Sequence, residues 1–259
     1  MTASNEGRRG NPPVDDDRPG AIDVASERVS TLVVQRRPVT DTVALDVDRG
    51  QAPFSVGIAT STQLNAFREL RTRLLAMASA IGRSYFTTLV VATTPGSGAS
   101  FVARNLAVAF TLQEHQLAIL VDCNLGHPMQ HRALGTATDE GGLFEFLERP
   151  QGNIEHLVRP TPIPGLHLIP AGRTPTLPRE YFSSQSMKLV MAGLKQAPCY
   201  SFLDGPPVKG SPDARILSES VDFVVLVAGY GHDTIDDITQ AAALFDPSKF
   251  AGVVFNERS

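Results

Sequence analysis

The segment TTPGSGAS, at 93–100, has the spacing of a phosphate-binding loop but lacks that loop's lysine. In the pattern G-x-x-x-x-G-K-[ST], Gly98 and Ser100 fit the second glycine and the hydroxyl residue. Thr93 stands at the first glycine, and Ala99 stands where the lysine is expected. The segment therefore raises the question of whether nucleotide chemistry persists without the cation that usually supports it.

The loop keeps what is needed to bind an anion through its backbone. In such loops the N–H groups and the following helix N-terminus hold phosphates, while the hydroxyl side chain reaches Mg²⁺. An ordinary glycine-rich turn between a strand and a helix is the alternative interpretation. The candidate nucleotide-binding residues here are Pro95, Gly96, Ser97, Gly98, Ala99 and Ser100.

Two aspartates, Asp122 and Asp204, each end an apolar run further along the chain. The carboxyl ends of parallel strands meet at a crevice where ligands bind. Because Mg²⁺ prefers oxygen ligands, Ser100, Asp122 and Asp204 form a candidate metal site. The alternatives are that Asp122 caps the next helical turn, and that Asp204 belongs to a turn stiffened by the prolines at 206–207.

These residues must be positioned by alternating strands and helices. Apolar runs without period-two alternation indicate strands that are covered on both faces. Their alternation with helical stretches predicts a doubly wound α/β domain with a mostly parallel sheet and helices on both faces. The expected strands are 87–92, 117–122, 166–170, 200–204, 222–228 and 251–255, and the expected helices are 62–80, 100–113, 179–196, 212–220 and 233–246.

The composition separates a first segment from this domain. Residues 1–60 are rich in Pro, Gly, Asp and Arg, so we expect a mobile segment before an α/β domain at 61–259, with 29–34 as one candidate strand. A net charge of −4 gives no support to nucleic-acid binding. No stretch approaches the ~20 apolar residues of a membrane span, and the start is too polar for a signal peptide. We expect a soluble, cytoplasmic protein that reaches the inner membrane only through a partner.

Taken together, the motifs resemble those of the bacterial tyrosine kinase family, the cytoplasmic P-loop proteins of capsule and exopolysaccharide synthesis. The resemblance covers about residues 60–256 and includes FRELRTRL, TTPGSGAS, VDCNLGHPMQH, GLFEFL, LIPAGRTPTLPRE, FLDGPP and GVVFN. It implies an ATP or ADP site with Mg²⁺, in which Asn256 matches the residue that contacts adenine. It also implies ring assembly through Arg68 and Arg71, which match two of the three positions of an E-x-x-R-x-x-R helix motif.

The sequence departs from the family where activity is concerned. The catalytic lysine aligns with Ala99, the second aspartate after the strand with Asn124, and an arginine with Gly126. The glutamate of the helix motif aligns with Asn65, and no tyrosine cluster follows the last strand. A cation that meets developing charge on the transferred phosphoryl group contributes mainly in the transition state. We therefore expect nucleotide and Mg²⁺ binding to be weak or absent.

Three functions are consistent with these features. The first is a pseudokinase, a non-catalytic regulator or scaffold that binds the cytoplasmic part of a membrane-anchored polysaccharide chain-length or export protein and can form homo-oligomers. The second is an active tyrosine kinase or ATPase that uses another cation, for which Lys209 is the candidate. The third is a positioning ATPase of the partitioning type. A pair of histidines, His127 and His131, has the spacing of metal ligands on a helix, but with no third ligand in view a surface or packing role explains them better.

Overall fold

The computed structural model describes residues 1–2, 61–137, 141–175 and 180–257. The mobile segment expected at 1–60 and the candidate strand at 29–34 therefore lie outside the described residues, apart from the first two. The strands are β1 (Thr87–Ala92), β2 (Ala118–Asp122), β3 (Arg159–Pro160), β4 (Leu166–Ile169), β5 (Tyr200–Asp204), β6 (Phe223–Gly229) and β7 (Phe250–Asn256). The helices are α1 (Ser61–Ala80), α2 (Ala99–Thr111), α3 (Gln130–Ala133), α4 (Leu143–Glu148), the 3₁₀ turn η1 (Ile154–Leu157), α5 (Gln185–Gln196), α6 (Asp213–Ser220) and α7 (Ile235–Ala242).

Within the described residues, these strands form one seven-stranded sheet in the order β3-β4-β2-β5-β1-β6-β7. Every neighbouring pair is parallel except β3 with β4. All six expected strands are present, and the doubly wound, mostly parallel fold is confirmed. Strand β1 lies between β5 and β6, so the loop that leaves it opens at the centre of the sheet.

The sheet has a hydrophobic core on each face because successive strand residues point to opposite sides. Leu89 and Val91 of β1 belong to one core, and Val90 and Ala92 belong to the other. All residues of β1, β2, β5 and β6 are buried, which explains why these strands show no alternation of polar and apolar residues.

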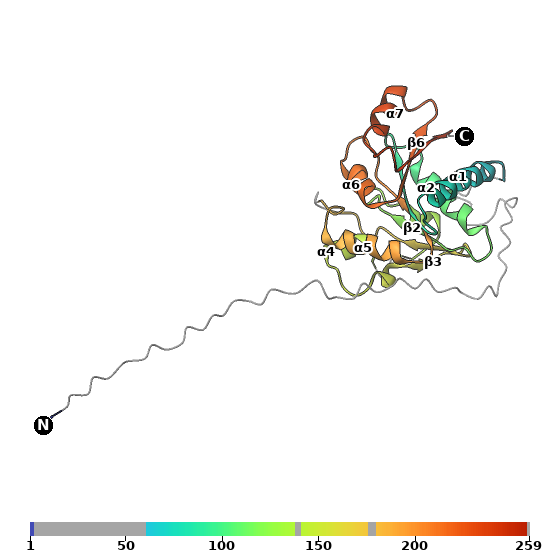
Figure 1. The fold of residues 1–259 in the computed structure, drawn as a ribbon. Helices are drawn as coiled ribbons and strands as arrows, with labels where there is room; N and C mark the ends of the chain where they lie inside the picture. The colour runs from blue at the N-terminus through green and yellow to red at the C-terminus, as the bar shows by residue number, and fades with distance from the viewer. Residues whose placement is uncertain (3–60, 138–140, 176–179, 258–259) are drawn as a thin grey trace.

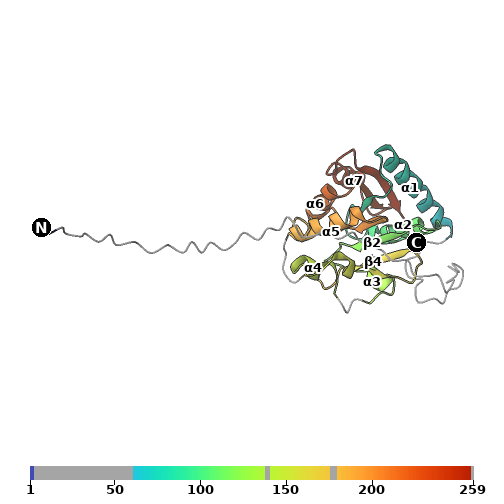
Figure 2. The ribbon, with the colours of Figure 1, turned by 60° about the horizontal axis from the view of Figure 1, so that its bottom comes forward.

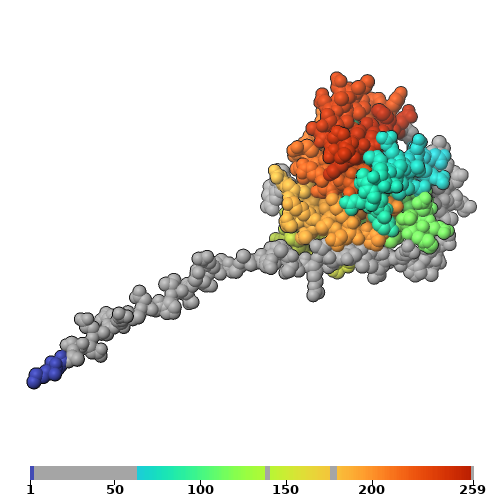
Figure 3. All heavy atoms as spheres, viewed as in Figure 1, coloured from blue at the N-terminus to red at the C-terminus, as the bar shows by residue number. Residues whose placement is uncertain are grey.

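The helices divide between the two cores. Helices α1 and α2 cover one face, while α4, α5, α6 and α7 contribute to the core on the other (Figures 1 and 2). On α1, Phe67 and Leu74 are buried, and the helix lies on the surface beside the C-terminal strand β7 (Figure 3). Helix α2 is buried along most of its length, so its N-terminus is fixed against the strand ends that carry the candidate site.

Two helices begin later than the sequence predicts because capping residues fix where they start, and α7 also ends earlier, at Ala242. The helix expected at 179–196 starts only at Gln185, since the Ser184 hydroxyl accepts a hydrogen bond from the Met187 N–H at 3.2 Å. The helix expected at 233–246 is α7 alone, which starts with a capping box between Thr234 and Asp237. The short antiparallel strand β3 was not predicted, and it pairs only two residues with β4.

The burial of α2 predicts that two leucines, one buried within the helix and one exposed at its C-terminus, differ strongly in how much they contribute to stability. Leu106→Ala should lower the free energy of unfolding by about 2–5 kcal/mol, because it removes a fully buried side chain from a packed core. Leu112→Ala, at a residue that is 43% exposed, is the matched control and should cost under about 1 kcal/mol. Urea unfolding measures both, and equal losses would contradict this placement of α2.

Candidate functional site

The loop between β1 and α2 has a backbone shape that depends on two glycines. Gly96 and Gly98 have φ angles of 92° and 96°, a left-handed conformation that disfavours residues with a side chain. Gly98 is also the N-cap of α2, whose first residue is Ala99. The Thr93 N–H anchors the start of the loop by donating to the Val227 carbonyl of β6 at 2.9 Å.

The loop encloses one side of a cavity of about 290 Å³. No described residue accepts a hydrogen bond from the backbone N–H of Gly96, Gly98, Ala99 or Ser100, so these donors are available to an anion. The cavity approaches the lower end of the volumes typical of small-molecule sites, and it suits a phosphate group better than a whole nucleotide. It is lined by Ala92, Pro95, Gly96, Gly98, Ala99, Ser100, Asn124, His127, Gly205 and Pro207.

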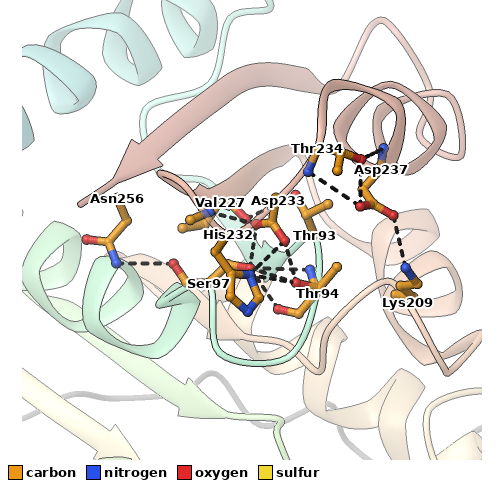
Figure 4. A network of polar contacts seen from close by, with 11 residues as sticks. Thr93, Thr94, Ser97, Lys209, Val227, His232, Asp233, Thr234, Asp237 and Asn256 are labelled. Carbon is orange, nitrogen blue, oxygen red and sulfur yellow. Dashed lines mark hydrogen bonds and ion pairs between the residues drawn. The ribbon is translucent and has the colours of Figure 1, made fainter. Parts of the chain in front are cut away.

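A buried carboxylate, Asp233, clamps the loop from the segment that follows β6 (Figure 4). Its Oδ2 accepts hydrogen bonds from the Ser97 hydroxyl and the Gly229 N–H, both at 2.6 Å. Its Oδ1 accepts from the Thr94 hydroxyl and lies 3.1 Å from His232 Nδ1. Burial acts to raise the pKa of Asp233, but the hydrogen bonds from Ser97 and Thr94 hold it below its ordinary value. The charged carboxylate therefore holds the loop in place through these hydrogen bonds.

Asn256, the residue expected at adenine, also holds the loop. Its Nδ2 donates to the Ser97 carbonyl at 3.1 Å (Figure 4). A Cβ placed on Gly98 would lie 2.1 Å from this nitrogen, so a glycine at 98 is required for the contact as well as for the turn. Asn256 does not line the cavity described above. Its expected contact with adenine stays a prediction.

Asp122 and Asp204 are brought together by the sheet. They are register partners at the ends of the neighbouring parallel strands β2 and β5, and both are fully buried. Asp204 Oδ1 accepts from the Ser100 hydroxyl at 3.1 Å, so the three expected metal ligands do form one group. Asp122 accepts backbone hydrogen bonds from Asn124 at 3.3 Å and from Gln130, the first residue of α3, at 3.1 Å. It therefore satisfies the N–H of the first residue of α3, although the N-cap residue of that helix is Met129.

The proximity and burial of the two carboxyl groups shift their pKa values upward. Burial, with added repulsion from Asp204, raises the pKa of Asp122 to about 8. Burial raises the pKa of Asp204 less, to about 6, because hydrogen bonds from Gln130 and Ser100 and the charge of Arg104 favour its ionised form. The pair therefore resists carrying two negative charges at neutral pH.

The fit of this group to Mg²⁺ is incomplete. The Ser100 side chain lies at the cavity, but neither Asp122 nor Asp204 lines it. Each of the four carboxylate oxygens already accepts at least one hydrogen bond. A metal ion bound directly by either aspartate would have to displace part of this network, since Mg²⁺ needs room for several waters. The three residues thus lie together, and their binding of Mg²⁺ stays a prediction.

Several other residues named from the sequence have definite places. Asn124 and His127 line the cavity, whereas Lys209 is exposed and its Nζ lies 3.0 Å from Asp237 Oδ1. Arg71 donates to the Ala109 carbonyl at 2.7 Å and so ties α1 to α2, while Arg68 is exposed. In the described part of the chain, no three His, Cys, Asp or Glu residues are grouped as a metal site. The described helices include none that is long and apolar enough to cross a membrane.

Sequence reasoning missed three polar residues of the site: Arg104, Gln130 and Asp233. Arg104 is the one charged residue in the sequence of α2, and that charge was the available signal. Gln130 lies within the quoted motif that follows Asp122, but its spacing alone does not indicate a contact with Asp204. The position of Asp233 against the loop depends on the packing of β6 beside β1, which local sequence does not reveal.

Comparison with known proteins finds bacterial tyrosine-protein kinases among the relatives. No protein-family profile matches the chain. It is 30% identical over 206 residues to tyrosine-protein kinase wzc of Salmonella typhimurium, a match that covers 78% of this chain and 28% of that protein. It is 28% identical over 192 residues to tyrosine-protein kinase YwqD of Bacillus subtilis, covering 73% of this chain and 79% of that protein.

A solved structure described as the BceF tyrosine kinase domain is 27% identical, with a TM-score of 0.63. That likeness covers 75% of this chain and 77% of the solved one. The chain spans little more than a quarter of the Salmonella protein, so it corresponds in length to one part of that relative.

Because Asp233 accepts several hydrogen bonds from the loop, we expect it to contribute more to the free energy of unfolding than the nearby exposed Asp236. Asp233→Ala should lower the free energy of unfolding by about 2 kcal/mol or more, because buried donors lose a charged acceptor. Asp236→Ala is the control, since Asp236 is exposed in the first turn of α7 and should change stability by under about 1 kcal/mol. Chemical denaturation separates the two, and a neutral Asp233→Ala would refute the clamp.

Proposed function

Because the chain is homologous to the bacterial tyrosine-protein kinases, we propose that it is a degenerate member that acts without catalysis in bacterial exopolysaccharide synthesis or export. In this role it is a regulator or scaffold that binds the cytoplasmic part of a membrane-anchored chain-length or export protein. The proposal places it at the inner membrane through that partner.

The observation that carries the proposal is Ala99 at the wall of the cavity. Ala99 is the first residue of α2, and it lines the space where a lysine would meet the terminal phosphates. None of the described residues that line the cavity is a lysine or an arginine. Phosphoryl transfer depends mainly on positioning and on cations that meet the developing charge. A loop that offers only N–H groups can hold an anion but gives little stabilisation to that transition state.

The alternative of an active kinase or ATPase needs a substitute cation. Lys209 is the candidate named from the sequence, but its ammonium group pairs with Asp237 and is 66% exposed. This pairing favours the non-catalytic proposal. The partitioning-type ATPase is less well supported, since the loop also lacks the additional lysine usual at its start in that class.

Weak nucleotide binding and self-association complete the proposal. The N–H groups of the loop and the Ser100 hydroxyl support a contact with the phosphates of ATP or ADP. Homo-oligomer contacts through α1 would use the exposed Arg68, whereas Arg71 also serves the contact with α2 inside one chain. Oligomerisation can thus be tested with Arg68→Ala, which removes no contact described within the chain.

We expect no tyrosine autophosphorylation. Incubation of the purified chain with labelled ATP, Mg²⁺ and a candidate activator should leave Tyr85, Tyr181, Tyr200 and Tyr230 unmodified, because the phosphoryl-transfer cation is missing. Phosphopeptide mass spectrometry measures the result, with an active tyrosine kinase of the family as the positive control. Stoichiometric phosphate on any of these tyrosines would overturn the proposal.

Restoring the lysine should recover binding more than chemistry. Ala99→Lys should tighten ATP binding by about 10- to 150-fold, the range expected for one hydrogen bond to a charged group. Gln113→Lys adds the same charge beyond the far end of α2 and should leave the affinity unchanged. Hydrolysis should stay low in both variants because Asn124 is uncharged. Equal affinities in Ala99→Lys and the native chain would show that the loop is not shaped for phosphate.

A further inference from the structure

Arg104 is the one charged residue among the buried residues of α2, whose other buried residues are apolar except for Asn105. It is 6% exposed and lies on α2, one turn after Ser100. Arginine is rarely buried unless its charge is paired, because removing a guanidinium from water is costly. Its NH1 donates to Gln130 Oε1 at 2.8 Å, and Gln130 is itself fully buried. This hydrogen bond satisfies one donor of Arg104 and the amide oxygen of Gln130, which partly offsets the cost of burying both side chains.

Gln130 connects this arginine to the carboxylate pair. Its Nε2 donates to Asp204 Oδ2 at 2.6 Å and to the Ser100 carbonyl at 2.9 Å. The partners fix the orientation of the amide. The guanidinium can only donate, so it faces the amide oxygen, whereas the Asp204 carboxylate and the Ser100 carbonyl accept, so they face the amide nitrogen. The Gln130 backbone N–H donates in turn to Asp122 Oδ2 at 3.1 Å. One residue thus bridges Arg104, Asp204, Asp122 and the phosphate-binding loop.

Arg104 and Gln130 supply the positive charge and the hydrogen-bond donors that the buried Asp122 and Asp204 carboxylates require. Carboxylates this close to one another need a positive charge and hydrogen-bond donors, and in a metal-binding site a divalent cation supplies the charge. Here the guanidinium faces the same pair through the amide, and both Asp122 and Asp204 attract its charge. The amide occupies Asp204 Oδ2, so the carboxylate is satisfied from inside the protein.

We propose that Arg104 and Gln130 form a built-in cationic closure of the Asp122–Asp204 pair, which takes the place of a divalent cation and makes the folded site independent of Mg²⁺. This proposal is separate from the absence of the loop's lysine at position 99. It concerns the carboxylates that would bind a metal ion, whereas the lysine would bind the phosphates. It rests on the contacts above and holds whether or not the chain transfers phosphate to a partner.

The test measures how tightly the nucleotide-free chain binds Mn²⁺, which is paramagnetic and substitutes for Mg²⁺. The native protein should leave the electron paramagnetic resonance signal of free Mn²⁺ unchanged up to about 1 mM, the weak end of protein sites for divalent cations. Its melting temperature should likewise not rise with Mg²⁺ or Mn²⁺. Native binding of Mn²⁺ in the micromolar range would overturn the proposal.

Substitutions at position 104 test whether Arg104 is the residue that prevents the binding of Mn²⁺. Arg104→Ala should bind Mn²⁺ at least about tenfold more tightly than the native chain, because the competing charge is gone and the carboxylates remain. The gain should disappear in the double variant with Asp204→Asn. Arg104→Lys keeps the charge and should behave as the native chain does, and Arg132→Ala, on exposed α3 surface, is the matched control. Unchanged Mn²⁺ affinity in folded Arg104→Ala would refute the assignment.

Three further outcomes can be told apart. If Arg104→Ala does not fold, which circular dichroism would reveal, the native response to Mn²⁺ decides the question by itself. If the native chain binds Mn²⁺ but phosphorylates no tyrosine, the closure is wrong while the proposed function stands. If tyrosine is phosphorylated while the nucleotide-free chain ignores Mn²⁺, the closure stands and the proposed function is wrong.

Discussion

Two carboxyl groups buried side by side constrain the whole site. Parallel pairing of β2 with β5 sets Asp122 against Asp204, and neither side chain reaches water. Such a pair is stable only when every oxygen has a donor and the charge is balanced. The donors come from the start of α2, the start of α3 and the buried side chains between them. The sheet and both helix starts are thereby held in one arrangement.

The phosphate-binding loop is held on its other side by a separate network. Asp233 accepts hydrogen bonds from Thr94 and Ser97, and Asn256 donates to the Ser97 carbonyl. The two networks leave the N–H groups at the N-terminus of α2 pointing to a small cavity while the loop itself is fixed. The loop therefore has the backbone shape of a phosphate-binding loop, and none of the described residues that line its cavity is a lysine or an arginine.

The sequence predicted the framework well because the relevant signals are local. Strands buried on both faces are continuous apolar runs, and the glycines at 96 and 98 mark a turn that other residues disfavour. Helix starts were less accurate, since a side-chain cap such as Ser184 lies within a longer periodic stretch. Strand β3 was missed because it is two residues long and one of them is Pro160, which breaks the usual strand pattern.

The site was predicted only in part for a physical reason. Ser100, Asp122 and Asp204 occur at strand or helix ends, where position follows from the fold. Arg104 and Gln130 matter because of what they contact across the fold, and residue type at a given spacing does not encode such contacts. The same limit applies to Asn256, whose side chain lies on the loop backbone in this structure.

Calorimetric titration of the native chain with ATP, in the presence and absence of Mg²⁺, tests the central claim most directly. A site with a phosphate-shaped loop, no lysine and a closed carboxylate pair should bind no more tightly than roughly tens of micromolar. The dissociation constant should also be nearly the same with and without Mg²⁺. Nanomolar binding that requires Mg²⁺ would contradict the account, because it would mean that the carboxylate pair opens to hold the metal and that the lysine is not needed.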